Sequence, residues 1–113
     1  MKGDKLFEDA IFDFENKRYN KAVSSFYFAV RWYAELLLKK LRSPIPRRDD
    51  KLANAIENLG LIDVARTLRL TYNLRLKADY SDFNITFEEA NQVKSIVENA
   101  ISKLRSHLFR KNK

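Results

Sequence analysis

Residues 21–41, KAVSSFYFAVRWYAELLLKKL, are the densest apolar run in the chain. An ordinary surface helix carries one apolar stripe about 100° wide. One such stripe, with residues spaced by three and four, consists of Val23, Phe26, Tyr27, Val30, Tyr33, Leu37 and Leu41. Further apolar residues lie outside the stripe, so this helix needs neighbours on more than one side. We therefore predict that residues 21–41 form the central helix of a helical bundle.

Phe28, Trp32 and Leu36 form a second apolar row in the same segment. Residues four apart lie one above another on a helix, so these three side chains share a face. A soluble monomer seldom leaves such a patch in water. Because a symmetric copy is the commonest cover for it, we predict a homodimer with this row at the interface.

The composition narrows the class of protein. A chain of 113 residues is expected to be one domain, residues 1–113. The absence of Cys excludes disulfides and thiolate metal sites, and two Gly and two Pro favour long helices over a turn-rich β fold. Arg31 and Glu35 interrupt the best candidate for a membrane span, and the first residues lack a signal-peptide core. We expect a cytoplasmic protein without a membrane segment. Abundant Lys, Arg and Glu beside a single Gln indicate a heat-adapted source.

Apolar periodicity divides the chain into five expected helices. They cover about residues 4–16, 21–41, 50–59, 64–78 and 87–108, and the expected N-caps are Asp4, Asn20, Asp49 or Asp50, Asp63 and Thr86. Gly60 is the expected stop of the third helix, and Thr86 with Glu89 has the form of a capping box. Leu59 and Phe87 are expected on buried faces. The sequence thus predicts an all-α fold, an antiparallel up-and-down bundle of four to five helices.

Four motifs follow one another in an order typical of a known family. They are the turn KRYNKA at residues 17–22, AVRWYAELLLKKL at 29–41, LRLKADY at 74–80 and TFEEA at 86–90. In this order and spacing the chain resembles the HEPN family of small helical proteins, often encoded beside a minimal nucleotidyltransferase. The resemblance implies a helical bundle that is usually a homodimer. It also implies a nucleotidyltransferase partner and a place in toxin–antitoxin, RNA-processing or nucleotide-linked systems.

The resemblance also suggests a catalytic motif, which this chain departs from. Active members of the family are metal-independent ribonucleases with an Arg and a His separated by four to six residues, brought together across the dimer. The sole His is His107, and residues 100–102 contain no Arg. Arg105 lies two residues before His107, a spacing that places two helical side chains on nearly opposite faces. We therefore expect no catalytic role for Arg105 and His107, and keep a ribonuclease as the alternative.

Metal and cofactor sites have little support in the sequence. Metal ligands come in clusters of His, Cys or carboxylates, and this chain has one His and no Cys. The adjacent carboxylates at 49–50 and 88–89 fall at expected helix starts, where negative charge is favourable. Two glycines are too few for a phosphate-binding loop. We expect neither a metal nor a cofactor.

Arg75, Asp79 and Tyr80 are the most informative polar group. Arg75 and Asp79 are four apart, so they can pair on a helix. We favour a structural clamp that closes the fourth helix against the fifth. The alternative is that Arg75 contacts a phosphate or a partner.

Two segments of the chain are strongly basic. Residues 39–51 hold six basic and two acidic residues, and residues 103–113 hold five basic and none acidic. Helix dipoles explain only part of this charge. We predict that Arg47, Arg48, Arg110 and Lys111 contact a polyanion or an acidic partner. The preferred interpretation is a non-catalytic binding or regulatory module that partners a nucleotidyltransferase. The alternatives are a ribonuclease and an RNA- or nucleotide-binding module.

Overall fold

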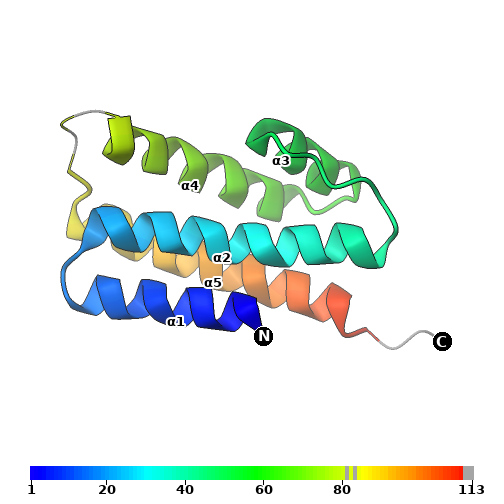
Figure 1. Cartoon of the computed structure of the whole chain (residues 1–113), viewed down its shortest axis with the longest axis horizontal. Helices are drawn as coiled ribbons and strands as arrows, with labels where there is room; N and C mark the ends of the chain where they lie inside the picture. Colours follow the sequence, from blue (N-terminus) through cyan, green and yellow to red (C-terminus); the bar gives the residue numbers. More distant parts are fainter. Residues whose placement is uncertain (81, 83, 111–113) are drawn as a thin grey trace.

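The computed structural model describes residues 1–80, 82 and 84–110 (Figure 1). Its helices are α1 (Lys2–Glu15), α2 (Tyr19–Lys40), α3 (Asp49–Asn58), α4 (Ile62–Tyr80) and α5 (Phe87–Leu108). These helices make up 81% of the structure, and the described residues contain no strand. The predicted all-α bundle is confirmed.

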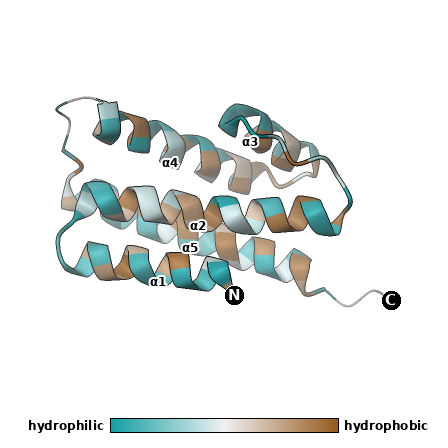
Figure 2. Cartoon of the chain, in the orientation of Figure 1, coloured by the Kyte–Doolittle hydropathy of each residue, from teal (hydrophilic) through white to brown (hydrophobic). Residues whose placement is uncertain are grey.

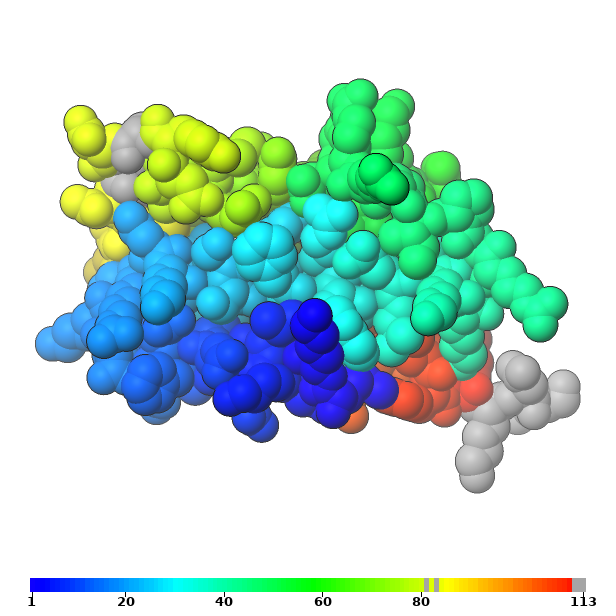
Figure 3. Space-filling view, in the orientation of Figure 1, coloured from blue at the N-terminus to red at the C-terminus, as the bar shows by residue number. Residues whose placement is uncertain are grey.

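Helix α2 lies at the centre of the bundle and contacts all four other helices. In the space-filling view, α1 covers one side of α2, while α3 and α4 stand on the opposite side (Figure 3). The predicted stripe is buried from Val23 to Leu37, and Figure 2 shows how apolar residues recur along α2. Leu41 is the exception, since α2 ends at Lys40 and leaves this side chain 49% exposed.

The four long helices alternate in direction, and the short α3 is inserted between α2 and α4 (Figure 1). As a result α2 and α5 run in the same direction, and their C-terminal ends meet. The Lys40 ammonium donates hydrogen bonds to the backbone carbonyls of His107, at 3.4 Å, and Leu108. Two segments that are far apart in the sequence therefore share one end of the bundle.

Several predicted helix starts are wrong by a few residues. Helix α1 begins at Lys2 with Met1 as its N-cap, so Asp4 already lies in the first turn. Helix α2 begins at Tyr19, and the Asn20 side chain instead accepts a hydrogen bond from the backbone N–H of Ile85 at 2.8 Å. Helix α4 begins at Ile62, which places Asp63 inside the first turn. A side chain used for a distant contact is not free to cap its own helix.

The helix ends combine expected and unexpected residues. The capping box is confirmed, with Glu89 N–H donating to the Thr86 hydroxyl at 3.2 Å and Thr86 N–H donating to the Glu89 carboxylate at 3.0 Å. Gly60 has the left-handed φ of 88° expected of a helix stop. Lys17 and Arg42 adopt the same region, with φ of 62° and 58°, just after α1 and α2. The sequence does not predict this conformation at either residue.

The prediction that Leu59 and Phe87 lie in the core is wrong. Leu59 is the C-cap of α3 and is 40% exposed. Phe87 is 49% exposed because it lies at the first position of α5, at the edge of the bundle. Its ring packs against the rings of Phe14, at a centroid distance of 5.6 Å, and Tyr19, at 6.0 Å. Phe87 therefore fastens the start of α5 to the first two helices.

Gly3 allows α1 to approach α2 closely. A Cβ atom at this buried position would lie 2.6 Å from ring atoms of both Trp32 and Tyr33. Atoms at that separation repel strongly, so any larger residue forces the two helices apart.

We predict that Gly3→Ala destabilises the bundle. Overpacking of a core costs about 1–3 kcal/mol, and a terminal helix position recovers less than the roughly 1 kcal/mol gained by Ala over Gly in a helix interior. Urea unfolding should show a net loss, with Lys5→Ala on exposed α1 surface as the control. An unfolding midpoint at or above that of the parent protein would contradict the packing described here.

Candidate functional site

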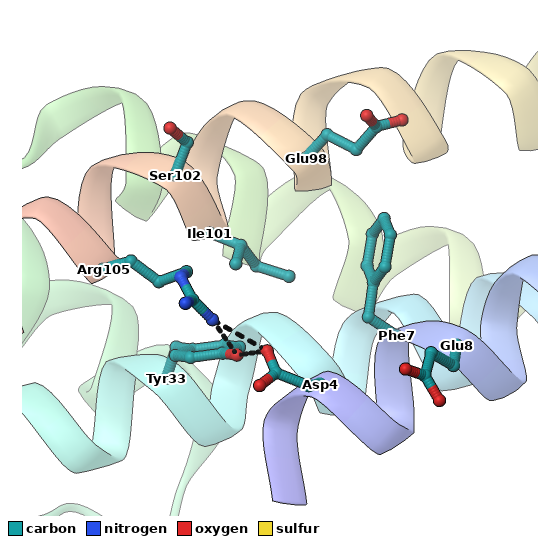
Figure 4. A pocket seen from close by; sticks show the side chains of 8 residues that line it. All are labelled: Asp4, Phe7, Glu8, Tyr33, Glu98, Ile101, Ser102 and Arg105. Atoms are coloured by element: carbon teal, nitrogen blue, oxygen red, sulfur yellow. Dashed lines mark hydrogen bonds and ion pairs between the residues drawn. The ribbon is translucent and has the colours of Figure 1, made fainter. Parts of the chain in front are cut away.

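A groove of about 570 Å³ runs between α1 and α5, with α2 as its floor (Figure 4). The residues that line it are Asp4, Phe7, Glu8, Tyr33, Glu98, Ile101, Ser102 and Arg105. Three of these side chains are carboxylates and one is a guanidinium. The groove is therefore locally acidic on a chain whose net charge is +7.

Asp4, Tyr33 and Arg105 form a hydrogen-bonded triad at one end of this groove (Figure 4). The Arg105 Nη1 donates to the Asp4 carboxylate at 2.8 Å and to the Tyr33 hydroxyl at 3.1 Å. The Tyr33 hydroxyl donates to the same Asp4 oxygen. Burial raises the pKa of Tyr33, and the hydrogen bond to Asp4 raises it further. The triad joins three helices, and its arginine is already neutralised.

Arg105 and His107 lie in different places, although both are on α5. Arg105 faces the groove, whereas His107 is half-buried among residues at the ends of α2 and α5. The bonds of Arg105 to Asp4 and Tyr33 both use its Nη1 atom. Within one chain the structure does not bring this Arg and His together as an acid–base pair.

Arg75 lies between α4 and α2. Its Nε is 3.2 Å from the Ser24 hydroxyl oxygen and 3.5 Å from an Asp79 carboxylate oxygen. Its guanidinium carbon lies 4.8 Å from the centre of the Phe28 ring, a cation–π geometry. Tyr80 is 82% exposed and lies at the end of α4. Among the described residues, the hydrogen bond and ring contacts that Arg75 makes outside α4 are with α2, whereas the predicted clamp was directed at α5.

A second polar cluster, which the sequence analysis did not predict, connects α2 to the start of α3. Tyr27 and Arg31 both donate hydrogen bonds to the Asp49 carboxylate, and Arg31 also donates to the Arg47 carbonyl at 3.0 Å. Burial raises the pKa of Asp49, and the positive charge of Arg75 opposes that rise. Arg31 interrupts an apolar run, which was the available signal that it has a buried partner.

The predicted polyanion contacts are divided among several surroundings. Arg47 contributes its carbonyl to the cluster around Asp49, and Arg48 pairs with Asp50 at 2.9 Å. Arg110 is exposed at the end of α5. Lys111 lies outside the described residues.

The predicted dimer row keeps one clearly exposed member. Phe28 is 41% exposed on the outer side of α2. Trp32 and Leu36 are half-buried and pack against the core of their own bundle. Trp32 lies beside Gly3, so α1 covers part of the row.

Within the described ranges of the chain, no three His, Cys, Asp or Glu side chains gather as a possible metal site. Across the same residues, every helix is too short or too polar to cross a membrane.

Comparison with known proteins gives two matches. The HEPN domain family matches residues 1–107. The chain is also 34% identical over 105 residues to the protein named "Putative toxin MJ0605" from Methanocaldococcus jannaschii. That alignment covers 84% of this chain and 75% of the relative.

We predict that Tyr33→Phe weakens the bundle by about 1–3 kcal/mol, because it leaves the Asp4 carboxylate and Arg105 without their shared partner. The folded-state pKa of Tyr33 is raised above 10.0, so folding favours the neutral phenol. Its contribution is fully present below about pH 10 and declines as the pH rises towards the folded pKa.

Urea unfolding of the parent protein and of Tyr33→Phe at neutral and alkaline pH measures this effect. The difference between their free energies of unfolding should be constant near neutrality and should shrink above pH 10. Tyr80→Phe, at a highly exposed position, is the matched control. Equal stability of the Tyr33→Phe and Tyr80→Phe proteins at pH 7 would rule out a stabilising triad.

Proposed function

This chain belongs to the HEPN domain family, and on that premise we propose that it is a binding or regulatory component of a toxin–antitoxin-like system. In this proposal the chain acts through a protein partner and not by cutting RNA. The toxin name of the relative supports the class of system. The resemblance to HEPN proteins encoded beside minimal nucleotidyltransferases supports such an enzyme as the partner.

The observation that carries the proposal is the state of Arg105. Its guanidinium is bonded to Asp4 and Tyr33 in the α1–α5 groove, whereas His107 lines a separate hollow at the ends of α2 and α5. An arginine that stabilises a phosphate in a transition state must be free to face it. Freeing Arg105 would leave the partly buried Asp4–Tyr33 pair without its positive charge. These contacts favour a structural role for Arg105 over a catalytic one.

One observation favours a second candidate, a metal-independent ribonuclease. His107 is half-buried beside Lys40 and Arg110, and cations near a histidine suit a phosphate substrate. In such an enzyme a partner copy would have to supply the missing arginine.

A ribonuclease assay with a co-purification arm tests the proposal. The purified chain, incubated with single-stranded RNA in a chelating buffer, should not cleave above background, and His107→Ala should behave identically. Co-expressed with a minimal nucleotidyltransferase of the same genome, the tagged chain should retain that protein through purification.

Two results would oppose the proposal. Cleavage that disappears in both His107→Ala and Arg105→Ala, but persists in the exposed control Arg66→Ala, would establish the ribonuclease. If the chain does not retain the nucleotidyltransferase, the proposal that this enzyme is the partner fails.

We further propose a homodimer through the row of Phe28, Trp32 and Leu36, with Phe28 as its exposed anchor. Light scattering should give roughly twice the chain mass of 13.3 kDa. Phe28→Glu should shift the protein to the monomer, because a charge at the interface centre loses its water. Leu70→Glu is the matched control, since Leu70 is a similarly exposed apolar residue on α4. If Phe28→Glu leaves the dimer intact, the interface lies on another face of the bundle.

A further inference from the structure

The end of the bundle where α2 and α5 finish contains a small hollow of about 230 Å³, which we call the terminal cup. The residues that line it are Leu37, Lys40, Leu41, Leu59, Leu61, His107 and Arg110. They come from the last turn of α2, the α3–α4 turn and the end of α5. The cup therefore lies at the end of the bundle where α2 and α5, which run in the same direction, both finish (Figure 1).

The walls of the terminal cup are aliphatic. Leu41 and Leu59 are 49% and 40% exposed, because each lies just beyond the end of its helix. Leu37 and Leu61 continue the wall inward. A side chain placed between these leucines would remove apolar surface from water on all of them, which is favourable. The hollow is smaller than the roughly 300–1,000 Å³ of a typical small-molecule site, so it suits one large side chain.

The rim of the terminal cup is basic. Lys40 is held there by its hydrogen bonds to the carbonyls of His107 and Leu108. Among the described residues that line the cup, none is acidic. The C-termini of α2, α3 and α5 and the N-terminus of α4 meet here and contribute together about one negative charge. Lys39, Lys40, Arg42 and Arg110 exceed that charge, so the end of the bundle keeps a positive field.

We propose that the terminal cup binds an acidic segment of a partner protein, with one apolar side chain seated between the leucines. Carboxylates on either side of that side chain would face Lys40 and Arg110. This inference rests on the proposed function, in which the chain acts through a protein partner, and it specifies the chemistry of the contact.

The walls favour a protein segment over RNA. Single-stranded RNA is held chiefly by bases stacked on aromatic side chains, together with phosphate contacts. Among the described residues that line the cup, the only ring belongs to His107, four residues are leucines, and the other two are Lys40 and Arg110. Leucines pack an aliphatic or aromatic side chain well and provide no flat face for a base. The α1–α5 groove does not suit an acidic segment, because its three carboxylates repel one.

A labelled peptide tests the inference. The probe is acetyl-Asp-Glu-Leu-Asp-Glu-Asp-amide carrying a fluorophore, titrated with the full chain by fluorescence anisotropy at low salt. The test variants are Leu59→Glu and Arg110→Glu, and the matched controls are Leu70→Glu and Arg66→Glu on α4. Each test variant should raise the Kd about tenfold or more, and the controls should leave it nearly unchanged. Circular dichroism checks the fold, and Arg110 is an exposed residue beyond the end of α5.

Three peptide results would overturn the inference. The first is the absence of binding by the parent protein at low salt. The second is equal binding of a peptide with Ser in place of Leu, since the leucine walls would then be unused. The third is tighter binding of hexauridylate that both test variants abolish, which would make the cup a nucleic-acid site.

A co-purification arm separates this inference from the proposed function. If the nucleotidyltransferase is retained by the parent chain and released by both test variants, the cup is its docking site. If it is retained equally by both variants, the cup proposal fails and the proposed function stands. If it is not retained by the parent chain, that partner fails, and the peptide titration still decides whether the cup takes an acidic segment.

Discussion

The burial of α2 on nearly every side is the constraint from which the rest of the structure follows. One or two neighbours leave part of such a helix in water, so α1, α3, α4 and α5 all pack against it. That burial also encloses polar atoms of Tyr27, Arg31 and Tyr33. Buried polar groups are costly without partners, and no buried side-chain nitrogen or oxygen of the described residues lacks one. The neighbouring helices therefore have to supply charges as well as apolar surface.

Two carboxylates from neighbouring helices are the partners of these buried polar groups of α2. Asp4 reaches Tyr33 from α1, and Asp49 reaches Tyr27 and Arg31 from α3. Each pair fixes the position of one outer helix along α2, since a shift by one turn would separate the groups. Arg105 joins the first pair and thereby ties α5 to the same place. The polar residues that first invite a catalytic interpretation are thus engaged in positioning helices.

The sequence was most informative where the cause of a structure is local. Apolar spacing located all five helices, and the capping box and Gly60 marked two boundaries correctly. It was least informative where a partner is distant: Asp4 and Asn20 looked like caps but bind Tyr33, 29 residues away, and Ile85, 65 residues away. The α1–α5 groove and the terminal cup depend on helix directions that no local pattern encodes. Spacing alone did place Arg105 and His107 on different sides of α5.

The net charge of the chain is a poor guide to its partners, because opposite charges occupy separate surfaces. Glu98 in the acidic groove and His107 in the terminal cup are nine residues apart on α5, or about 13 Å along the helix. The Debye length at physiological ionic strength is about 8 Å, so a bound group at either place responds mainly to its own surroundings. A partner therefore meets a local charge and not the total of +7.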